Sequence, residues 1–277
     1  MTAIIAFQGE LGAYSHQACR DARPDMQPLA CKTFEDAIEA VHSGNAALAM
    51  LPVENTTFGR VPDIHQLIPN SGLHIIGEAF VRVHINLWGV AGSTLDTVKS
   101  ARSHPVLLGQ CRDFLAKHKL DAVKSADTAG SAMEVAAFKD PSQAALASDI
   151  AGEIYDLELL ARHIEDHDKN TTRFLIMAPE PDQSRRGDTK MMTSFVFRVR
   201  NLPAALYKAM GGFATNGVNM TKLESYMVDG EFTATQFYAD IDGHPDDDNV
   251  QRALEELDYF TDMIRILGVY PADAARP

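Results

Sequence analysis

The stretch that decides the fold runs from residue 170 to residue 177 and reads Asn170-Thr171-Thr172-Arg173-Phe174-Leu175-Ile176-Met177. Its apolar end is typical of a short buried strand, which would deliver the preceding hydroxyls and guanidinium from a strand end. A guanidinium held there is a planar fork suited to one carboxylate, and an adjacent hydroxyl can donate or accept a proton. An isolated Thr-Arg pair is more often a solvated surface feature, so the rest of the chain must decide between the two interpretations.

The bulk composition indicates a folded protein of two domains. The chain has 277 residues, of which 45% are hydrophobic and 23% charged, and its formal net charge is -13. Its longest basic run is Arg185-Arg186, which argues against a nucleic-acid or anionic-membrane partner. An anionic substrate would therefore be bound by a few local donors working against the overall field.

Motifs for metal or nucleotide chemistry are missing from the sequence. Cys19, Cys31 and Cys111 stand far apart in no metal-ligand spacing, which predicts reduced thiols and a cytoplasmic protein. The N-terminus has no basic flank and no long apolar run, so we expect neither a secretory signal nor a membrane span. There is no P-loop, no HxxE motif and no nucleophile elbow, so we expect no cofactor and no metal.

The first part of the chain alternates strands and helices. Alternation of this kind, linked by crossing strands, predicts two α/β lobes with ligands bound in the cleft between them. We expect strands at 4–7, 47–51 and 144–147, a β-rich crossing at 74–90, and helices at 14–23, 34–42, 95–101, 106–118, 131–138 and 150–163.

A second module follows a linker. Residues 179–190 contain two prolines, one glycine and almost nothing apolar, which is typical of a linker. Beyond it the order is β-α-β-β-α-β, the ferredoxin-like arrangement, with Asp229-Gly230 at the hairpin turn. We expect strands at 193–200, 219–228, 231–241 and 263–270, and helices at 203–215 and 247–260.

Four polar segments of the first module are candidates for chemistry. Residues 9–16 join the first strand to the first helix, where glycines and free N–H groups suit an anion. The other three are 52–59, with Asn55 and Thr56, 103–105, with Ser103 and His104, and 127–131, with Thr128. Turn and helix capping explain the same residue types, and Glu54 favours an ion pair over a catalytic base.

Taken in order, these segments and Asn-Thr-Thr-Arg-Phe resemble prephenate dehydratase over the whole chain. The resemblance implies a two-lobed, periplasmic-binding-protein-like (type II) catalytic domain at 1–178, a linker at 179–190 and an ACT regulatory domain at 191–277. Lobe 1 would span about 1–75 plus 165–178, and lobe 2 about 76–164. It also implies conversion of prephenate to phenylpyruvate in phenylalanine biosynthesis, in a homodimer or homotetramer without cofactors.

The resemblance also implies roles for particular residues. Thr172 matches the catalytic threonine, Arg173 the substrate-binding arginine and Phe174 the packing beside them, while Asn55, Thr56, Ser103, His104 and Thr128 match residues that line the cleft. In the ACT module, Ala204, Leu206, Asn219, Glu224 and Ser225 match the region that binds phenylalanine as an effector. Ala204 replaces a glycine of the family pattern, Tyr226 an arginine, and Val106 a glutamine.

Loss of the ring carboxylate and the ring hydroxyl makes the ring of prephenate aromatic. The protein must therefore orient the substrate and help the hydroxyl leave. We expect Thr172 to protonate that hydroxyl with His104 or His16 behind it, and Arg173 to bind the side-chain carboxylate. Two alternatives stay open: arogenate dehydratase, and a non-catalytic amino-acid-sensing protein.

Overall fold

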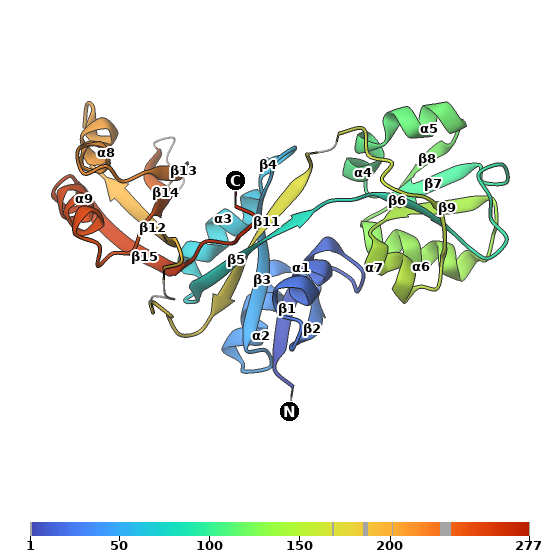
Figure 1. The fold of residues 1–277 in the computed structure, drawn as a ribbon, viewed down its shortest axis with the longest axis horizontal. Coiled ribbons are helices and arrows are strands. Elements are labelled where there is room, and N and C mark those ends of the chain that lie inside the picture. The colour runs from blue at the N-terminus through green and yellow to red at the C-terminus, as the bar shows by residue number, and fades with distance from the viewer. Residues whose placement is uncertain (1, 168, 185–187, 201, 228–233, 277) are drawn as a thin grey trace. The chain divides into compact units, whose positions relative to one another are not determined.

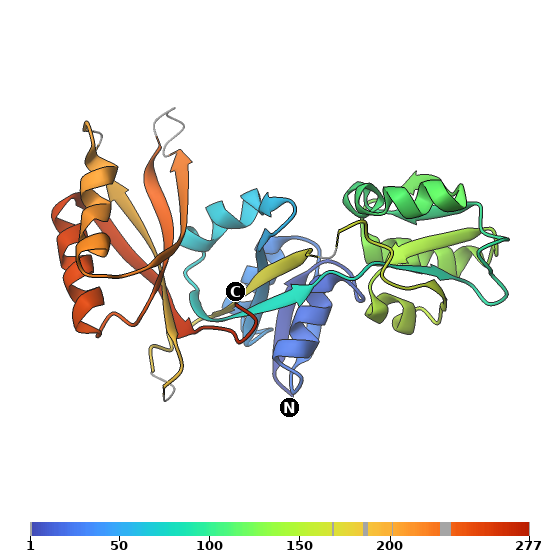
Figure 2. The ribbon, with the colours of Figure 1, turned by 45° about the horizontal axis from the view of Figure 1, so that its top comes forward.

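The computed structural model describes residues 2–167, 169–184, 188–200, 202–227 and 234–276 (Figures 1 and 2). It divides into two compact units. Unit 1 comprises Met1–Ile64 and Ala79–Phe174, and unit 2 comprises His65–Glu78 and Leu175–Pro277. The domain boundaries implied by the resemblance, at 178 and 191, stay predictions.

The first lobe of unit 1 is built on a sheet in the order β2-β1-β3, with β11 on the far side of β3. Strand β1 pairs in parallel with both β2 and β3, as the alternation of strands and helices predicts. The strands are β1 (Ile4–Gln8), β2 (Gln27–Cys31), β3 (Leu48–Asn55), the short β4 (Gly59–Arg60) paired with β3, and β11 (Thr171–Ala178), and the helices are α1 (Tyr14–Ala22), α2 (Phe34–His42) and α3 (Pro62–Leu67).

The second lobe of unit 1 is a five-stranded sheet in the order β10-β6-β9-β7-β8. Its strands are β6 (Asn86–Gly89), β7 (Ser100–Ser103), β8 (Asp121–Lys124), β9 (Gln143–Ala147) and β10 (Glu158–Ala161), and its helices are α4 (Pro105–Gln110), α5 (Arg112–His118), α6 (Thr128–Phe138) and α7 (Asp149–Ile154). Both faces are apolar, because two separate buried clusters include Leu146 and Trp88 respectively. The predicted α/β class with two lobes is confirmed.

One helix predicted in this lobe is absent, and another is shorter than predicted. Residues 95–101 form turns that lead into β7, and the helix expected at 150–163 ends at Ile154. It ends because Asp156 takes a left-handed conformation, with φ 52°, and because the Leu157 N–H bonds to the Gly152 carbonyl oxygen at 3.0 Å. The apolar residues that follow form β10.

Unit 2 contains the predicted β-α-β-β-α-β module, so the ferredoxin-like arrangement is confirmed. Its elements are β12 (Met191–Val199), α8 (Ala205–Thr215), β13 (Met220–Met227), β14 (Ala234–Asp242), α9 (Asp248–Tyr259) and β15 (Thr261–Pro271), in the sheet order β13-β14-β12-β15. Both helices share one apolar cluster with the strands, including Phe195, Phe213 and Leu257. The predicted turn at Asp229-Gly230 lies outside the described residues.

One further strand extends the sheet of unit 2. β5 (His74–Arg82), which follows the 3-10 helix η1 (Ile68–Asn70), pairs in parallel with β15 where Gly268 faces Ile75. A Cβ at Gly268 would lie 2.1 Å from the Ile75 carbonyl oxygen, so only glycine allows this approach.

The three cysteines are free thiols. Among the residues that the structure describes, no helix is long and apolar enough to span a bilayer, and no three His, Cys, Asp or Glu side chains gather as metal ligands.

Candidate active site

A pocket of about 340 Å³ lies in unit 1, at the carboxyl ends of strands from both lobes. Such strand ends are where α/β sheets place their ligands. The first lobe contributes the turn between β1 and α1, the second lobe contributes the turns before α4 and α6, and β11 contributes two side chains. The lining residues are Gln8, Gly9, Glu10, Ala13, Tyr14, Ser15, Pro52, His104, Ala126, Asp127, Thr128, Thr172 and Phe174.

The starts of two helices of at least nine residues open onto this pocket. Helix α1 begins at Tyr14 after Ala13, whose side chain forms no cap, and α6 begins at Thr128. The positive ends of both helix dipoles favour an anion. The first N–H groups of α1 have no side-chain cap, whereas at α6 the Asp127 carboxylate accepts the Gly130 N–H at 2.6 Å. Among the described lining residues there is no Lys or Arg, and Glu10 and Asp127 carry negative charge. The pocket therefore offers backbone donors, hydroxyls and one imidazole.

Thr172 is positioned by a network that fixes the direction of its hydroxyl. The Asn55 Oδ1 atom accepts hydrogen bonds from the backbone N–H groups of Thr57 at 2.9 Å and Phe58 at 3.1 Å. This fixes the orientation of the amide, so Asn55 Nδ2 donates to Thr172 Oγ1 at 2.9 Å and to Asn170 Oδ1 at 2.7 Å. No described residue accepts a hydrogen bond from the Thr172 hydroxyl. Its hydrogen is thus available to a ligand in the pocket.

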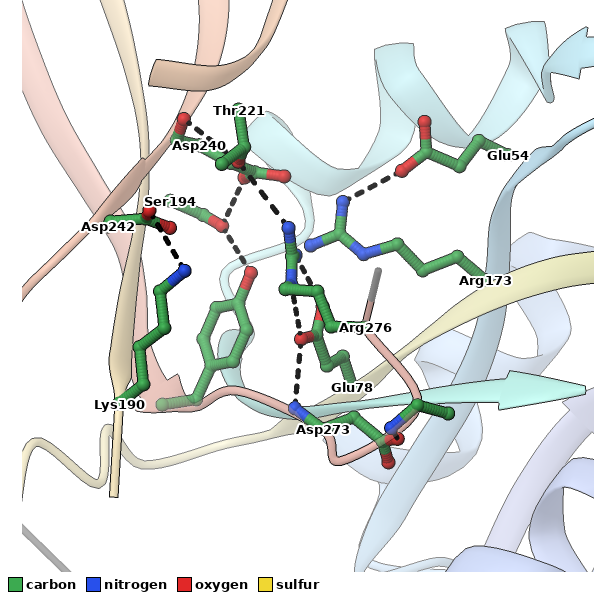
Figure 3. A network of polar contacts seen from close by, with 12 residues as sticks. Glu54, Glu78, Arg173, Lys190, Ser194, Thr221, Asp240, Asp242, Asp273 and Arg276 are labelled. Atoms are coloured by element: carbon green, nitrogen blue, oxygen red, sulfur yellow. Dashed lines mark hydrogen bonds and ion pairs between the residues drawn. The ribbon is translucent and has the colours of Figure 1, made fainter. Parts of the chain in front are cut away.

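Arg173 lies on the opposite face of β11. Successive side chains of a strand point to opposite faces, so Thr172 and Phe174 line the pocket while Arg173 does not. The Arg173 Nη1 atom lies 2.8 Å from Glu54 Oε1, and the guanidinium side chain is only 4% exposed (Figure 3). Sequence reasoning expected both Thr172 and Arg173 in one cleft; the alternation of the strand separates them. The expected ion pair of Glu54 is present.

The other candidate residues of unit 1 divide between the pocket and the framework. His104 and Thr128 line the pocket, and His104 Nδ1 accepts the Val106 N–H at 3.3 Å. Ser103 is fully buried and donates to the Leu146 carbonyl oxygen at 2.8 Å, and Thr56 donates to the Lys169 carbonyl oxygen at 2.6 Å. Neither hydroxyl lines the pocket.

The histidine at residue 16, expected as a proton donor, is also outside the pocket lining. His16 stacks on Phe7 with ring centroids 5.6 Å apart, and its Nδ1 accepts the Gly12 N–H at 3.0 Å. Burial, and secondarily the charge of Arg20, lowers the pKa of His16. An imidazole held neutral as an acceptor suits a structural role, and of the two histidines only His104 lines the pocket.

The candidate regulatory residues lie in unit 2 around the start of α8, on β13 and, for Asn219, directly before β13. Ala204 precedes α8 in a left-handed conformation, and Leu206 packs on the apolar cluster of the module. Asn219 donates to Asp242 Oδ2 at 3.0 Å, Glu224 lies 3.5 Å from Lys222 Nζ, and Ser225 is exposed. A pocket of about 500 Å³ lies beside Ala205, lined also by Arg200, Leu202, Pro203, Lys208, Asp258, Tyr259 and Phe260.

Sequence reasoning covered Glu10, Tyr14 and Asn170 only as members of longer segments and assigned none of them a role of its own. Tyr14 donates from its hydroxyl to the His84 carbonyl oxygen at 2.7 Å, and burial raises its pKa well above the ordinary value. Asn170 is 3% exposed and orients Asn55. The signal for Glu10 and Tyr14 was their place in the first strand–helix turn, and Asn170 directly precedes the Thr-Thr-Arg segment.

Comparison with known proteins gives one family. A family model described as prephenate dehydratase matches residues 5–182. A Komagataeibacter europaeus protein, named bifunctional N-acyl-homoserine lactone acylase/prephenate dehydratase, is 50% identical over 99% of this chain and 97% of its own length. Arogenate dehydratase/prephenate dehydratase 1 of Arabidopsis thaliana is 36% identical over 98% of this chain and 73% of its own length.

The solved structures that are similar over nearly the whole chain include the following two. One, described as a novel type of quorum quenching acylase, has a TM-score of 0.93 and 50% identity, covering 99% of this chain and all of its own. The other is prephenate dehydratase from Arthrobacter aurescens in complex with L-Phe, with a TM-score of 0.89 and 29% identity, covering 99% of this chain and 92% of its own.

Proposed function

Because this chain belongs to the prephenate dehydratase family, we propose that it converts prephenate to phenylpyruvate, carbon dioxide and water in phenylalanine biosynthesis. One observation carries the proposal: a threonine hydroxyl lines the pocket and already accepts a hydrogen bond from Asn55. That hydroxyl can therefore donate its own hydrogen to the hydroxyl that leaves the substrate ring. Proton donation of this kind is worth about 10²–10⁴-fold in rate.

The reaction needs one proton and no oxidant. The bond between ring and carboxylate breaks, its electron pair enters the ring, and the bond to the ring hydroxyl breaks as that group gains a proton. Thr172 supplies this proton, and the lining group that can then give a proton back to Thr172 is His104. Its Nδ1 accepts the Val106 N–H, so the hydrogen of the neutral ring is on Nε2.

The charge of the pocket suits loss of a carboxylate. A cation beside the ring carboxylate would stabilise the ground state and slow its departure, and none of the described lining side chains is Lys or Arg. We assign the side-chain carboxylate of prephenate to the N–H groups that begin α1 and α6. Arg173 then acts through Glu54, by holding β11 against β3, and Phe174 packs beside the ring.

The test is turnover of prephenate, followed by the ultraviolet absorbance of phenylpyruvate, with arogenate assayed in parallel. Thr172→Val removes the donor, and Asn55→Asp keeps the acceptor for Thr57 and Phe58 but turns the Thr172 hydrogen toward the new carboxylate. Both variants should lose kcat by about 10²-fold or more with little change in KM. Thr171→Val, on the other face of β11, is the control and should stay within about twofold of the original kcat.

A chain that binds prephenate without turnover would instead be a sensor, the outcome that contradicts the enzyme proposal. If the chain turns over arogenate but not prephenate, its substrate is arogenate, which has an amino group in place of the ketone. Equal loss in the Thr172 and Thr171 variants would remove Thr172 from the mechanism.

We further propose that unit 2 is an ACT module that binds phenylalanine and lowers activity, in an assembly of two or four chains. The support is the prephenate dehydratase complexed with L-Phe, which is similar over 99% of this chain. Isothermal titration with phenylalanine, combined with inhibition of prephenate turnover, tests this. The absence of both heat and inhibition would contradict it.

A second candidate activity is hydrolysis of N-acyl-homoserine lactones. The observation in favour of this activity is the 50% identity to a protein that has the activity in its name. The similarity covers 97% of that protein's length. Mass spectrometry of homoserine lactone released from an N-acyl substrate tests it. If acyl hydrolysis persists in Thr172→Val, the two activities do not share the threonine.

A further inference from the structure

We propose that the Ser148 and Tyr155 hydroxyls, together called the catch, hold the turn around Gly12 by hydrogen bonds. They thereby set the distance between the two walls of the pocket. The inference rests on the proposed dehydratase reaction, for which both are positioning residues. Ser148 stands before α7 in the second lobe and is 2% exposed. Its Oγ donates to the Gly12 carbonyl oxygen in the first lobe at 2.6 Å and accepts the Ala151 N–H at 3.2 Å.

Gly12 is shaped for this contact. Its φ is +98°, and a Cβ there would lie 2.9 Å from the Cα of Ala151, so a larger residue would push the two backbones apart. Its N–H donates to His16 Nδ1 while its carbonyl accepts from Ser148. Both polar backbone groups of Gly12 are thus occupied, one by each lobe.

Tyr155 makes a second contact of the same kind. Its hydroxyl donates to the Leu11 carbonyl oxygen at 3.0 Å. Partial burial, followed by the nearby carboxylates of Glu10 and Asp127, raises the pKa of Tyr155, so the hydroxyl keeps its hydrogen. The two donors of the second lobe therefore bind consecutive carbonyl groups of one turn, beside which Figure 1 places α7.

The turn that accepts these two hydrogen bonds is also one wall of the pocket. Gly9, Glu10 and Ala13 line it from the first lobe, while Asp127 and Thr128 line it from the second lobe, which carries α7. The catch therefore fixes the distance between the starts of α1 and α6, where we place the substrate carboxylate. If the catch is lost, fewer molecules hold the binding-competent spacing, and apparent affinity falls by that fraction.

The experiment compares Ser148→Ala and Tyr155→Phe with Thr33→Ala. Thr33 caps α2, so its loss matches the capping loss at Ser148 but lies outside the pocket lining. Ser148→Ala should raise KM for prephenate by about tenfold and Tyr155→Phe by about threefold, with kcat within about twofold in both. Thr33→Ala should leave KM unchanged.

A second measurement needs no substrate. Amide hydrogen exchange of a peptide covering residues 9–17 should be faster in Ser148→Ala and Tyr155→Phe than in Thr33→Ala. Faster exchange with the predicted KM supports the catch, and unchanged exchange or unchanged KM overturns it. If the original chain turns over neither prephenate nor arogenate, the proposed function fails, while exchange alone still reports whether the two donors hold the turn.

Discussion

At the scale of single residues, the neutral state of His16 matters to the turn it supports. The ring is buried, its Nδ1 accepts the Gly12 N–H, and burial lowers its pKa below the ordinary value near 6.5. A protonated ring carries hydrogen on Nδ1 and can no longer accept. Protonation therefore opposes both burial and the hydrogen bond.

The stability of the chain should depend on pH through His16. Well above pH 6.5 the ring is neutral in both folded and unfolded chains, and its contribution is complete. As the pH falls, the unfolded chain binds the proton first, so the free energy of unfolding decreases until the folded pKa is passed. His16→Asn keeps an acceptor near the Nδ1 position and does not titrate. Urea unfolding between about pH 7 and 5 should show a steeper decrease for the original chain than for this variant; parallel curves would contradict the assignment.

Residue types were more predictable than the partners of each side chain. The sequence indicated that hydroxyls and an imidazole gather at strand ends, and Thr172, His104 and Thr128 do line one pocket. Ser103 and Thr56 resemble them in sequence but bond to Leu146 and Lys169, partners far away in the chain. The placement of Arg173 was within reach of sequence reasoning, because adjacent residues of a strand cannot share a face.

At the scale of elements, long periodic segments were predictable and short ones were not. The β-α-β-β-α-β order of residues 191–271 follows from alternation and helical spacing. In contrast, the strands β2, β8 and β10 have only four or five residues each. Their polar or proline residues obscure the alternation of apolar and polar positions that would indicate a strand. The helix expected at 106–118 is two helices, because Cys111, with ψ 29°, breaks the helical path between α4 and α5.

The start of α8 carries strain that a single substitution should relieve. Ala204 has φ 60°, a conformation that costs an L-residue about 1–2 kcal/mol. Ala204→Gly should raise the free energy of unfolding by about 0.5–1 kcal/mol, after the greater freedom of unfolded glycine is subtracted. Ala214→Gly, at an exposed position in the last turn of the same helix, should lower it by at most about 1 kcal/mol. Chemical denaturation of both variants tests the pair, and two changes of the same sign would contradict the strained geometry.

At the scale of the whole molecule, the proposed binding of an anionic substrate must overcome the charge of an acidic chain. The net charge is -13, and the pocket lining adds Glu10 and Asp127. The attraction must then come from fixed dipoles at close range, since N–H groups act within the first turn of a helix and salt screens the distant charges. Composition argues against nucleic-acid partners, but it could not show that none of the described lining side chains is Lys or Arg.

The C-terminal segment closes unit 2 around a buried carboxylate. Arg276 donates from Nε to Glu78 Oε1 at 2.8 Å and from Nη2 to Oε2 at 2.6 Å, and the Asp273 N–H adds a bond to Oε1 at 3.1 Å (Figure 3). The Glu78 side chain has no exposed surface, and that of Arg276 is 12% exposed. A buried charge that loses its partner keeps its desolvation cost. Removing one member of such a pair is therefore more destabilising than replacing both members by apolar residues.

Arg276→Met should therefore lower the free energy of unfolding of unit 2 by about 3 kcal/mol, because it leaves the Glu78 carboxylate buried without its bidentate cation. Arg200 provides the matched control: it pairs with Asp262 at 3.1 Å but its side chain is 57% exposed, so Arg200→Met should cost at most about 1 kcal/mol. Adding Glu78→Gln to Arg276→Met should recover part of the loss, since the uncompensated charge is then gone. Urea titrations that follow each unit separately make the comparison, and an equal cost for the two arginine variants would show that the C-terminal pair behaves as a surface contact.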